Sequence, residues 1–295
     1  MAREFDLVDW IRSRQPCSAL VPVPAGDDMA VLKWPAEQLL LVGVDQVLDT
    51  VHFDSAVHAP RDIGRKVMNR NLSDCAAMAC LPVAAVATVA LKQGSSLEYA
   101  QELYLGMQDA AAAFGAVVVG GDTGSWRGNL VMTVTILGRS AEVQPVRRRG
   151  ARPGDGLYVT GSLGGSLLGR HMTFVPRVAE GRVLGRCGSV TAMIDLSDGL
   201  SRDLLHLCQA SEVGAVVDAA SVPVHPDAVE LSRRDGKLAF EHALHDGEDY
   251  ELLFTSRSAP PIGKRIGTIS AERSLLIEID GRRTPLEAGG WEHEL

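Results

Sequence analysis

The sequence predicts an α/β (α+β) protein built from two domains. Three observations indicate this: the chain length, the alternation of strand-like and helix-like segments in both halves, and a loop-like stretch near the middle. A chain of 295 residues is longer than one typical domain and leaves room for two hydrophobic cores. Alternating strands and helices are typical of the α/β and α+β classes. Residues 138–156 are rich in glycine, proline and arginine, so we place the boundary there, between an N-terminal domain, 1–140, and a C-terminal α/β domain, 141–295.

The first half is predicted to contain helices between several strands. Apolar positions at a helical spacing predict helices over residues 3–14, 61–80 and 97–114. The last two end where a proline and a glycine follow. A continuous apolar run at 39–44 predicts a strand buried on both faces. The remaining strands are expected at 83–91, 116–119 and 130–137, with a glycine-rich loop at 120–128 between the last two.

The second half repeats the alternation. Strands are predicted at 157–160, 192–196 and 214–218, and a helix at 199–210. The glycine-rich segment Gly161–Gly165 follows the first of these strands. Its backbone amides offer a cradle for a phosphate group, but it lacks the spacing of a dinucleotide-binding motif, and we interpret it as a plain turn. The sequence contains no Gly-x-x-x-x-Gly-Lys-Ser/Thr loop, so a nucleotide site would be of another kind.

Composition and charge disfavour several classes of partner. The net charge is −8 and the one basic run is Arg147–Arg149, which disfavours nucleic acid. The five cysteines form no Cys-x-x-Cys pair, which disfavours a disulfide framework or a zinc site and favours a reducing cytoplasm. The N-terminus lacks the apolar segment of a signal peptide, and apolar stretches such as 81–91 are too short to cross a bilayer. We therefore expect a cytoplasmic protein that binds neither nucleic acid nor membrane.

Carboxylates follow apolar runs at several points in the chain. The acids in these turns are Asp28, Asp45, Asp74, Asp122 and Asp195, with Asp198 three residues later. Two unit charges about 4 Å apart repel by roughly 4 kcal/mol at an effective dielectric of about 20, so a cluster of them needs protons or cations. Oxygen ligands without cysteine or paired histidine favour Mg²⁺, which binds carboxylates together with substrate phosphates. Because ligands of α/β folds gather where strands end, the acids predict a site for metal-assisted phosphoryl transfer.

Each acid considered alone has a simpler structural interpretation. An aspartate in a glycine- or serine-rich turn most often binds nearby backbone amides. Asp74 is then the N-cap of a helix that begins at Cys75, and Asp203 is a surface residue. Only the joint pattern of acids favours the metal site.

A series of motifs in a fixed order resembles the thiamine-monophosphate kinase family. The motifs are Gly26–Leu32, Asp45 with Val51–Phe53, Asn71–Met78, Gly120–Thr123, Ile194–Leu200, Gly247–Phe254 and Gly290–His293. They cover nearly the whole chain. The same superfamily contains aminoimidazole ribonucleotide synthetase and selenophosphate synthetase, whose two-domain fold the chain is therefore expected to resemble.

The resemblance implies transfer of the ATP γ-phosphoryl group to thiamine monophosphate, with several Mg²⁺ ions. Because the acceptor is already an anionic phosphate, we expect no general base. It also implies that the N-terminal domains pair in a homodimer. The positions that match the family's metal ligands are Asp28, Asp45, Asp74, Asp122, Asp195 and Asp198. The positions that match its nucleotide contacts are Tyr104, Gly121, Asp122, Arg148 and Ser197. The positions that match its substrate contacts are His52, Glu248 and Trp291, and the Trp291 ring would stack on the cationic thiazolium.

The chain also departs from the family pattern. Gly43 and Val44 stand where the family has two hydroxyl residues, and Asp246 stands where it has a glycine. Two alternatives therefore remain open: an ATP-using superfamily member with another small acceptor, and a nucleotide-binding homologue without turnover. We favour the kinase because the acids and the substrate positions are retained together. Without the resemblance, His52 and Trp291 would be better interpreted as structural residues.

Overall fold

The computed structural model describes residues 7, 10–11, 13–14, 19–22 and 30–291. The chain divides into two compact units, Met1–Cys75 with Leu81–Glu142 and Ala76–Cys80 with Val143–Leu295. Of the helix expected over 3–14, only Leu7, Trp10 and Ile11 are described, and all three are helical. The expected metal ligand Asp28 lies outside the described residues.

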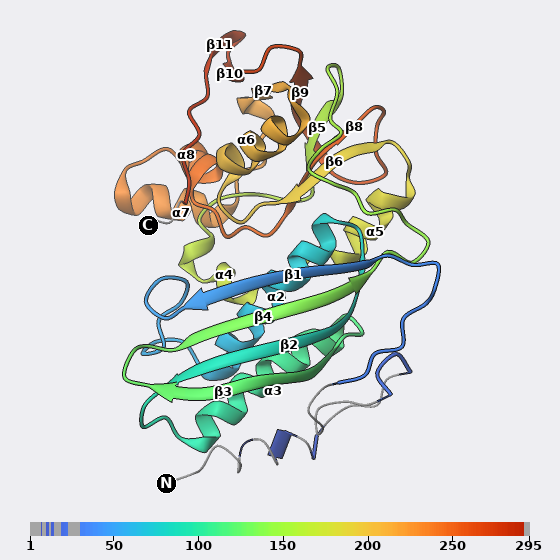
Figure 1. The fold of residues 1–295 in the computed structure, drawn as a ribbon. Helices are drawn as coiled ribbons and strands as arrows, with labels where there is room; N and C mark the ends of the chain where they lie inside the picture. The colour runs from blue at the N-terminus through green and yellow to red at the C-terminus, as the bar shows by residue number, and fades with distance from the viewer. Residues whose placement is uncertain (1–6, 8–9, 12, 15–18, 23–29, 292–295) are drawn as a thin grey trace. The chain divides into compact units, whose positions relative to one another are not determined.

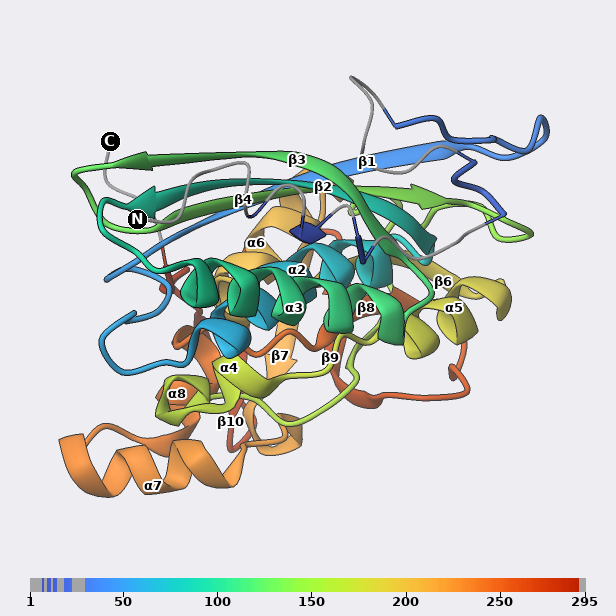
Figure 2. The ribbon, with the colours of Figure 1, turned by 90° about the horizontal axis from the view of Figure 1, so that it is seen from below.

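Among the described residues, the first unit contains a four-stranded sheet with the helices α2 and α3 on one face (Figures 1 and 2). Across the sheet the strands are β1 (Leu40–Leu48), β4 (Val131–Arg139), β2 (Leu81–Lys92) and β3 (Val117–Trp126). The β2–β3 pair is parallel and the other two pairs are antiparallel. The helices are α2 (Pro60–Ala77) and α3 (Leu97–Ala113), which confirms both predictions from the apolar spacing. Fully buried Ile63 and Leu103 from the helices and Met132 and Ile136 from the sheet form the core of this unit.

The two helices of the first unit touch backbone to backbone. A Cβ atom on Gly64 would lie 2.0 Å from the Leu103 carbonyl oxygen, and one on Gly106 would lie 2.0 Å from the Arg61 carbonyl oxygen. Only glycine at these two positions permits this approach. The Arg61 guanidinium also pairs with Asp109 across the crossing, at 2.6 Å.

The prediction that residues 39–44 form a strand buried on both faces is wrong in its second part. The strand exists as β1, but the Leu40, Val42 and Val44 side chains are 52%, 62% and 62% exposed. Successive side chains of a strand point to opposite faces, and the helices cover only one face of this sheet. The apolar run therefore has one covered side, with Gly43 and Asp45, and one open apolar side.

The glycine-rich loop expected at 120–128 is also largely strand. β3 continues to Trp126 and pairs in parallel with β2 as far as Lys92. Gly121 lies opposite Ala87, and a Cβ atom on Gly121 would lie 1.9 Å from the Ala87 carbonyl oxygen. The glycine here allows close approach of two strands instead of ending one.

The second unit is built on a seven-stranded sheet. Across it lie β11 (Arg282–Pro285), β10 (Leu275–Ile279), β7 (Gly214–Asp218), β9 (Lys264–Ser270), β5 (Gly156–Val159), β8 (Leu252–Ser256) and β6 (Val190–Asp195). Strands β10 and β7 pair in parallel, and the other neighbouring strands of this sheet pair antiparallel. The helices are α4 (Arg170–Thr173), α5 (Val178–Arg186), α6 (Leu200–Ser211), α7 (Pro226–Asp235) and α8 (Ala239–His245), with short 3₁₀ turns at Ser166–Leu168 and Ala219–Ser221.

The main core of the second unit lies between α6 and the sheet. Leu200, Leu204 and Leu207 of α6 are fully buried with Leu157 and Leu253 of the sheet. The predicted strands at 157–160, 192–196 and 214–218 and the helix at 199–210 are confirmed as β5, β6, β7 and α6. No helix among the described residues combines the length and the apolar character needed to span a membrane.

Candidate active site

Two of the predicted metal ligands lie on the helix-covered face of the first unit. Asp45 lies on β1, and Asp74 lies in the last turn of α2. A Cβ atom on Gly43, two residues before Asp45 on the same side of β1, would lie 3.4 Å from the Asp74 carboxylate. The Arg70 guanidinium is 3.7 Å from the Asp45 carboxylate and offsets part of the negative charge.

The placement of Asp74 contradicts its interpretation as an N-cap, because α2 begins at Pro60. A carboxylate in the last turn of a helix faces the negative end of the helix dipole, which is unfavourable by about 0.3–1 kcal/mol. The last turn of α2 itself contains no basic residue.

Asp122 does not join Asp45 and Asp74 in this structure. The strand register places Asp122 opposite Thr88, in the same row as Gln46 and Thr133. Gln46 donates a hydrogen bond to the Thr133 hydroxyl at 3.1 Å, so this row faces the side of the sheet opposite Asp45. Gly121 is in the row of Asp45, and Asp122 is exposed.

The other positions predicted in the first unit are buried. Tyr104 of α3 is 4% exposed, and its ring contacts Trp10 edge to face with 5.7 Å between ring centroids. His52 is 9% exposed, and its Nδ1 accepts a hydrogen bond from the Leu48 backbone N–H at 3.1 Å. Because Nδ1 is the acceptor, the ring proton of a neutral His52 lies on Nε2.

The turn between β6 and α6 carries three predicted residues of the second unit. Asp195 ends β6 and is buried, and the half-buried Ser197 and Asp198 precede the first residue of α6. The buried Asp203 carboxylate accepts hydrogen bonds from the backbone N–H groups of Asp198 and Gly199, at 3.1 and 3.2 Å. These bonds fold the turn back onto the start of α6.

The interpretation of Asp203 as a surface residue is therefore wrong. Its side chain is only 2% exposed, and sequence reasoning missed it as a residue that supports the site. Burial, together with the charges of Asp195 and Asp198, raises the pKa of Asp203 to about 8. The signal in the sequence was its position in the first turn of a helix, where a carboxylate meets unpaired N–H groups.

Two segments from the end of the chain join this turn. The Glu248 N–H donates to the Ser197 carbonyl at 2.7 Å, and the Trp291 N–H donates to the Asp198 carbonyl at 3.0 Å. Trp291 keeps half of its side chain exposed. A Cβ atom on Gly290 would lie 2.2 Å from the Asp198 carbonyl oxygen, so the terminal segment lies directly on the turn.

Arg148 also belongs to this neighbourhood. Its guanidinium opposes the rise in the pKa of Asp203, and its carbonyl accepts a hydrogen bond from the Ser211 hydroxyl at 2.9 Å. Arg148 is exposed. The second unit thus contains, near this turn, the exposed Arg148 guanidinium, the Ser197 hydroxyl, several carboxylates and the partly exposed Trp291 ring.

Both acid pairs consist of the hard oxygen donors that suit Mg²⁺. Asp45 and Asp74 form one pair, and Asp195 and Asp198 the other. Within the residues that the structure describes, no three or more histidine, cysteine or acidic side chains are arranged to hold a metal ion. A metal at either pair would therefore take most of its ligands from water or from a phosphate-bearing ligand, as Mg²⁺ commonly does.

Replacing Asp203 with alanine is expected to lower the free energy of unfolding by about 1–3 kcal/mol, because two buried backbone N–H groups lose their acceptor. Asp203→Asn should recover most of this loss, since its amide oxygen can accept the same two hydrogen bonds. Urea unfolding of both variants measures the difference. Equal stability of the alanine variant and the native protein would contradict this role.

The class of the protein follows from comparison with known families. Residues 26–140 match the family described as AIR synthase related protein, N-terminal domain. The fold described above, with one mixed sheet in each unit, is thus that of an AIR synthase-like protein.

Within this class, proteins named thiamine-monophosphate kinase match most of the chain. Thiamine-monophosphate kinase of Rhodopirellula baltica is 41% identical to this chain, covering 85% of this chain and 81% of the relative. The crystal structure of thiamine-monophosphate kinase from Stenotrophomonas maltophilia K279a matches with a TM-score of 0.81 at 31% identity, over 94% of this chain and 96% of that one. AaThiL complexed with AMPPCP and TMP matches with a TM-score of 0.80 at 28% identity, over 100% and 99%. The chain belongs to the thiamine-monophosphate kinase family.

Proposed function

We propose that this protein transfers the γ-phosphoryl group of ATP directly to thiamine monophosphate, forming thiamine diphosphate and ADP. Membership of the family supports this activity, as does the similarity to AaThiL, which was solved with AMPPCP and TMP. The observation that carries the proposal is the convergence of Ser197, Asp198, Glu248 and Trp291 in one place. These residues come from three segments, and the resemblance assigns them to metal, nucleotide and substrate.

The side chains of the second unit suit different parts of the two substrates. The Ser197 hydroxyl and the Arg148 guanidinium suit the phosphate oxygens of a nucleotide. The exposed part of the Trp291 ring suits the cationic thiazolium of thiamine monophosphate, and Glu248 adds a negative charge beside it. The acceptor oxygen is already anionic near neutral pH, so no side chain has to remove a proton. Catalysis then depends on positioning and charge neutralisation.

Mg²⁺ would supply the positive charge that the transferred phosphoryl group requires. We assign its binding to the carboxylates of Asp45 and Asp74 in the N-terminal domain (1–140) and of Asp195 and Asp198 in the C-terminal domain (141–295). Asp28 and Asp122 remain further proposed ligands, and His52, Tyr104 and Gly121 remain proposed substrate and nucleotide contacts. A cytoplasmic location is likewise a proposal, based on the cysteine pattern.

Gly43 and Val44, the two positions in β1 that differ from the family pattern, lie on opposite faces of the sheet. Val44 points to the open face of the sheet, away from Asp45, because the two are neighbours on one strand. Only Gly43 shares the face of Asp45. Water would therefore have to replace only the hydroxyl that is missing at Gly43. Because Mg²⁺ commonly takes water as a ligand, a homologue without turnover is the weaker alternative.

The exposed apolar side chains along β1 support a homodimer. Leu40, Val42 and Val44 expose apolar side chains in a row along β1, and Val86 of β2 adds to them. Exposed apolar patches of this kind mark interaction surfaces. We expect the native protein to have the mass of two chains in light scattering, and Val44→Glu to shift it towards one. A native monomer at micromolar concentration would contradict the dimer.

The activity itself is tested by incubating the purified protein with ATP, Mg²⁺ and thiamine monophosphate and separating the products. Thiamine diphosphate formed in proportion to ADP supports the proposal. ADP formed only with a different small phosphorylated acceptor would support the first alternative. Binding of ATP in calorimetry without transfer to any acceptor would support the homologue without turnover.

A further inference from the structure

The backbone amides of the Gly161–Gly165 loop are occupied by carboxylates of the same chain. The Gly164 N–H donates to both oxygens of Asp249, at 3.0 and 3.1 Å, and the Gly165 N–H donates to Asp246 at 2.8 Å. Both glycines have positive φ values, 89° and 72°. Successive amides in such a conformation form a concave anion-binding site. Here the carboxyl groups of Asp246 and Asp249 occupy this site, so the loop serves as an internal anchor and not as a phosphate-binding loop.

The two carboxylates lie on either side of Glu248, in a strained turn. Glu248 and Tyr250 both have a φ of 52°, and Gly247 between Asp246 and Glu248 has a φ of 73°. A residue other than glycine in the left-handed region is strained and persists only where its surroundings hold it. The Ser166 hydroxyl, next to the loop, donates to the Gly247 carbonyl at 2.7 Å. The conformation of Glu248 is thus held from both ends.

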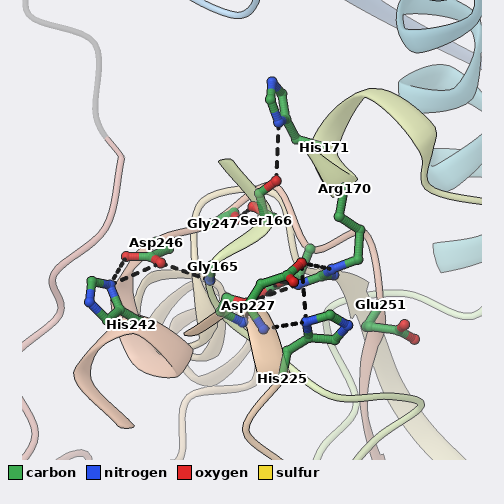
Figure 3. Close-up of polar contacts among 12 residues, drawn as sticks. Gly165, Ser166, Arg170, His171, His225, Asp227, His242, Asp246, Gly247 and Glu251 are labelled. Atoms are coloured by element: carbon green, nitrogen blue, oxygen red, sulfur yellow. Dashed lines mark hydrogen bonds and ion pairs between the residues drawn. The ribbon is translucent and has the colours of Figure 1, made fainter. Parts of the chain in front are cut away.

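Asp246 is itself oriented by a buried histidine (Figure 3). His242 Nδ1 lies 2.9 and 3.1 Å from the two Asp246 oxygens, and His242 Nε2 lies 3.3 Å from Asp235. His242 is 3% exposed. Burial lowers the pKa of His242, but the hydrogen bonds to Asp246 and Asp235 and the charges of these carboxylates together raise the net pKa. His242 thereby fixes Asp246, at the end of α8, to the last residue of α7.

We propose that Asp246 is a positioning residue that holds Glu248 in its substrate-binding conformation through the Gly165 amide. A glycine at position 246 would leave both the Gly165 amide and His242 without this partner. Asp246 carries out no chemistry itself. Its loss should therefore weaken binding of thiamine monophosphate and leave binding of ATP unchanged. The inference rests on the proposed function, because Glu248 is a proposed substrate contact.

The variant Asp246→Ala is expected to raise the KM for thiamine monophosphate by about 10-fold, the effect of losing one hydrogen bond to a charged group. The dissociation constant of ATP, measured by calorimetry, should change by less than about twofold. Asp246→Asn is the second variant: it keeps the shape and an acceptor oxygen for Gly165, so it should show a smaller rise. An unchanged KM for thiamine monophosphate in Asp246→Ala would overturn the proposal.

Asp235→Asn is the matched control. It alters the other carboxylate that contacts His242 but touches neither the Gly165 amide nor the Glu248 turn. Any loss of thermal stability should be shared by Asp235→Asn and Asp246→Ala, whereas the change in KM should belong to Asp246→Ala alone. An equal rise of KM in both variants would show a general structural effect and contradict the positioning role.

Amide hydrogen exchange separates failure of this inference from failure of the proposed function. Faster exchange at Gly165 and Glu248 in Asp246→Ala, relative to both the native protein and Asp235→Asn, supports the anchor even if thiamine monophosphate is not the substrate. Unchanged exchange at both amides would overturn it regardless of activity. Absence of thiamine diphosphate formation by the native protein would count against the proposed function alone.

Discussion

Asp74→Asn is expected to lower kcat/KM for thiamine monophosphate by about 10³-fold, because a bound metal contributes several kcal/mol of charge stabilisation in the transition state. Asparagine keeps the shape of the side chain but removes the negative charge that holds the cation. Initial rates at saturating ATP and Mg²⁺ measure the effect.

Asp62→Asn is the matched control for this variant. Asp62 lies in the first turn of the same helix, where it pairs with Arg65 at the surface. Its replacement removes an equal charge from α2 at the opposite end of the helix. We expect its activity to stay within about twofold of native. Robust turnover by Asp74→Asn, or an equal loss in Asp62→Asn, would contradict a metal site at Asp74.

Gly121→Ala is expected to destabilise the protein by about 3 kcal/mol, the upper end of the usual cost of overpacking. The added Cβ atom would lie 1.9 Å from the Ala87 carbonyl oxygen, so β2 and β3 would have to separate. The midpoint of urea unfolding measures the change, with the slope of the transition as a check on its cooperativity.

Gly124→Ala tests the same chemical change on the same strand. Nothing lies within 4 Å of a Cβ atom at Gly124, and its backbone does not require glycine. We expect this variant to be neutral or slightly stabilising, because alanine restricts the unfolded chain. Similar stabilities for the two variants would contradict the close approach of β2 and β3.

The sequence predicted the helices of the first unit well, because α2 and α3 combine an apolar stripe with a residue that ends each helix. It failed at β3 for a physical reason. Gly120, Gly121 and Asp122 have the chemistry of a turn, but pairing with β2 determines their conformation. Local sequence propensity cannot reveal pairing with a strand that lies more than thirty residues away in the chain.

The burial of β1 could not be predicted for a related reason. An apolar run such as 39–44 indicates a strand, but whether one or both faces are covered depends on where the helices lie. In this structure α2 and α3 cover one face, so Val42 and Val44 stay exposed. The same alternation separates Asp45 from Asp122, two acids that the sequence pattern had grouped together.

The candidate site was predicted by resemblance, while its supporting contacts were not. Glu248 and Trp291 were expected as substrate contacts, and the structure places both on the turn that carries Ser197 and Asp198. The anchors behind them join residues far apart in the chain, as with Gly165 and Asp246, which are 81 positions apart. No local sequence pattern predicts a hydrogen bond between residues so far apart. The sequence therefore identified Asp246 only as a departure from the family pattern.

The central claim is tested most directly with ATP labelled at the γ-phosphorus. Purified protein is incubated with labelled ATP, Mg²⁺ and thiamine monophosphate, and the label is followed into each product. Direct transfer predicts that the label appears in the terminal phosphate of thiamine diphosphate, in a one-to-one ratio with ADP. Label released only as inorganic phosphate, with no labelled thiamine diphosphate, would contradict it.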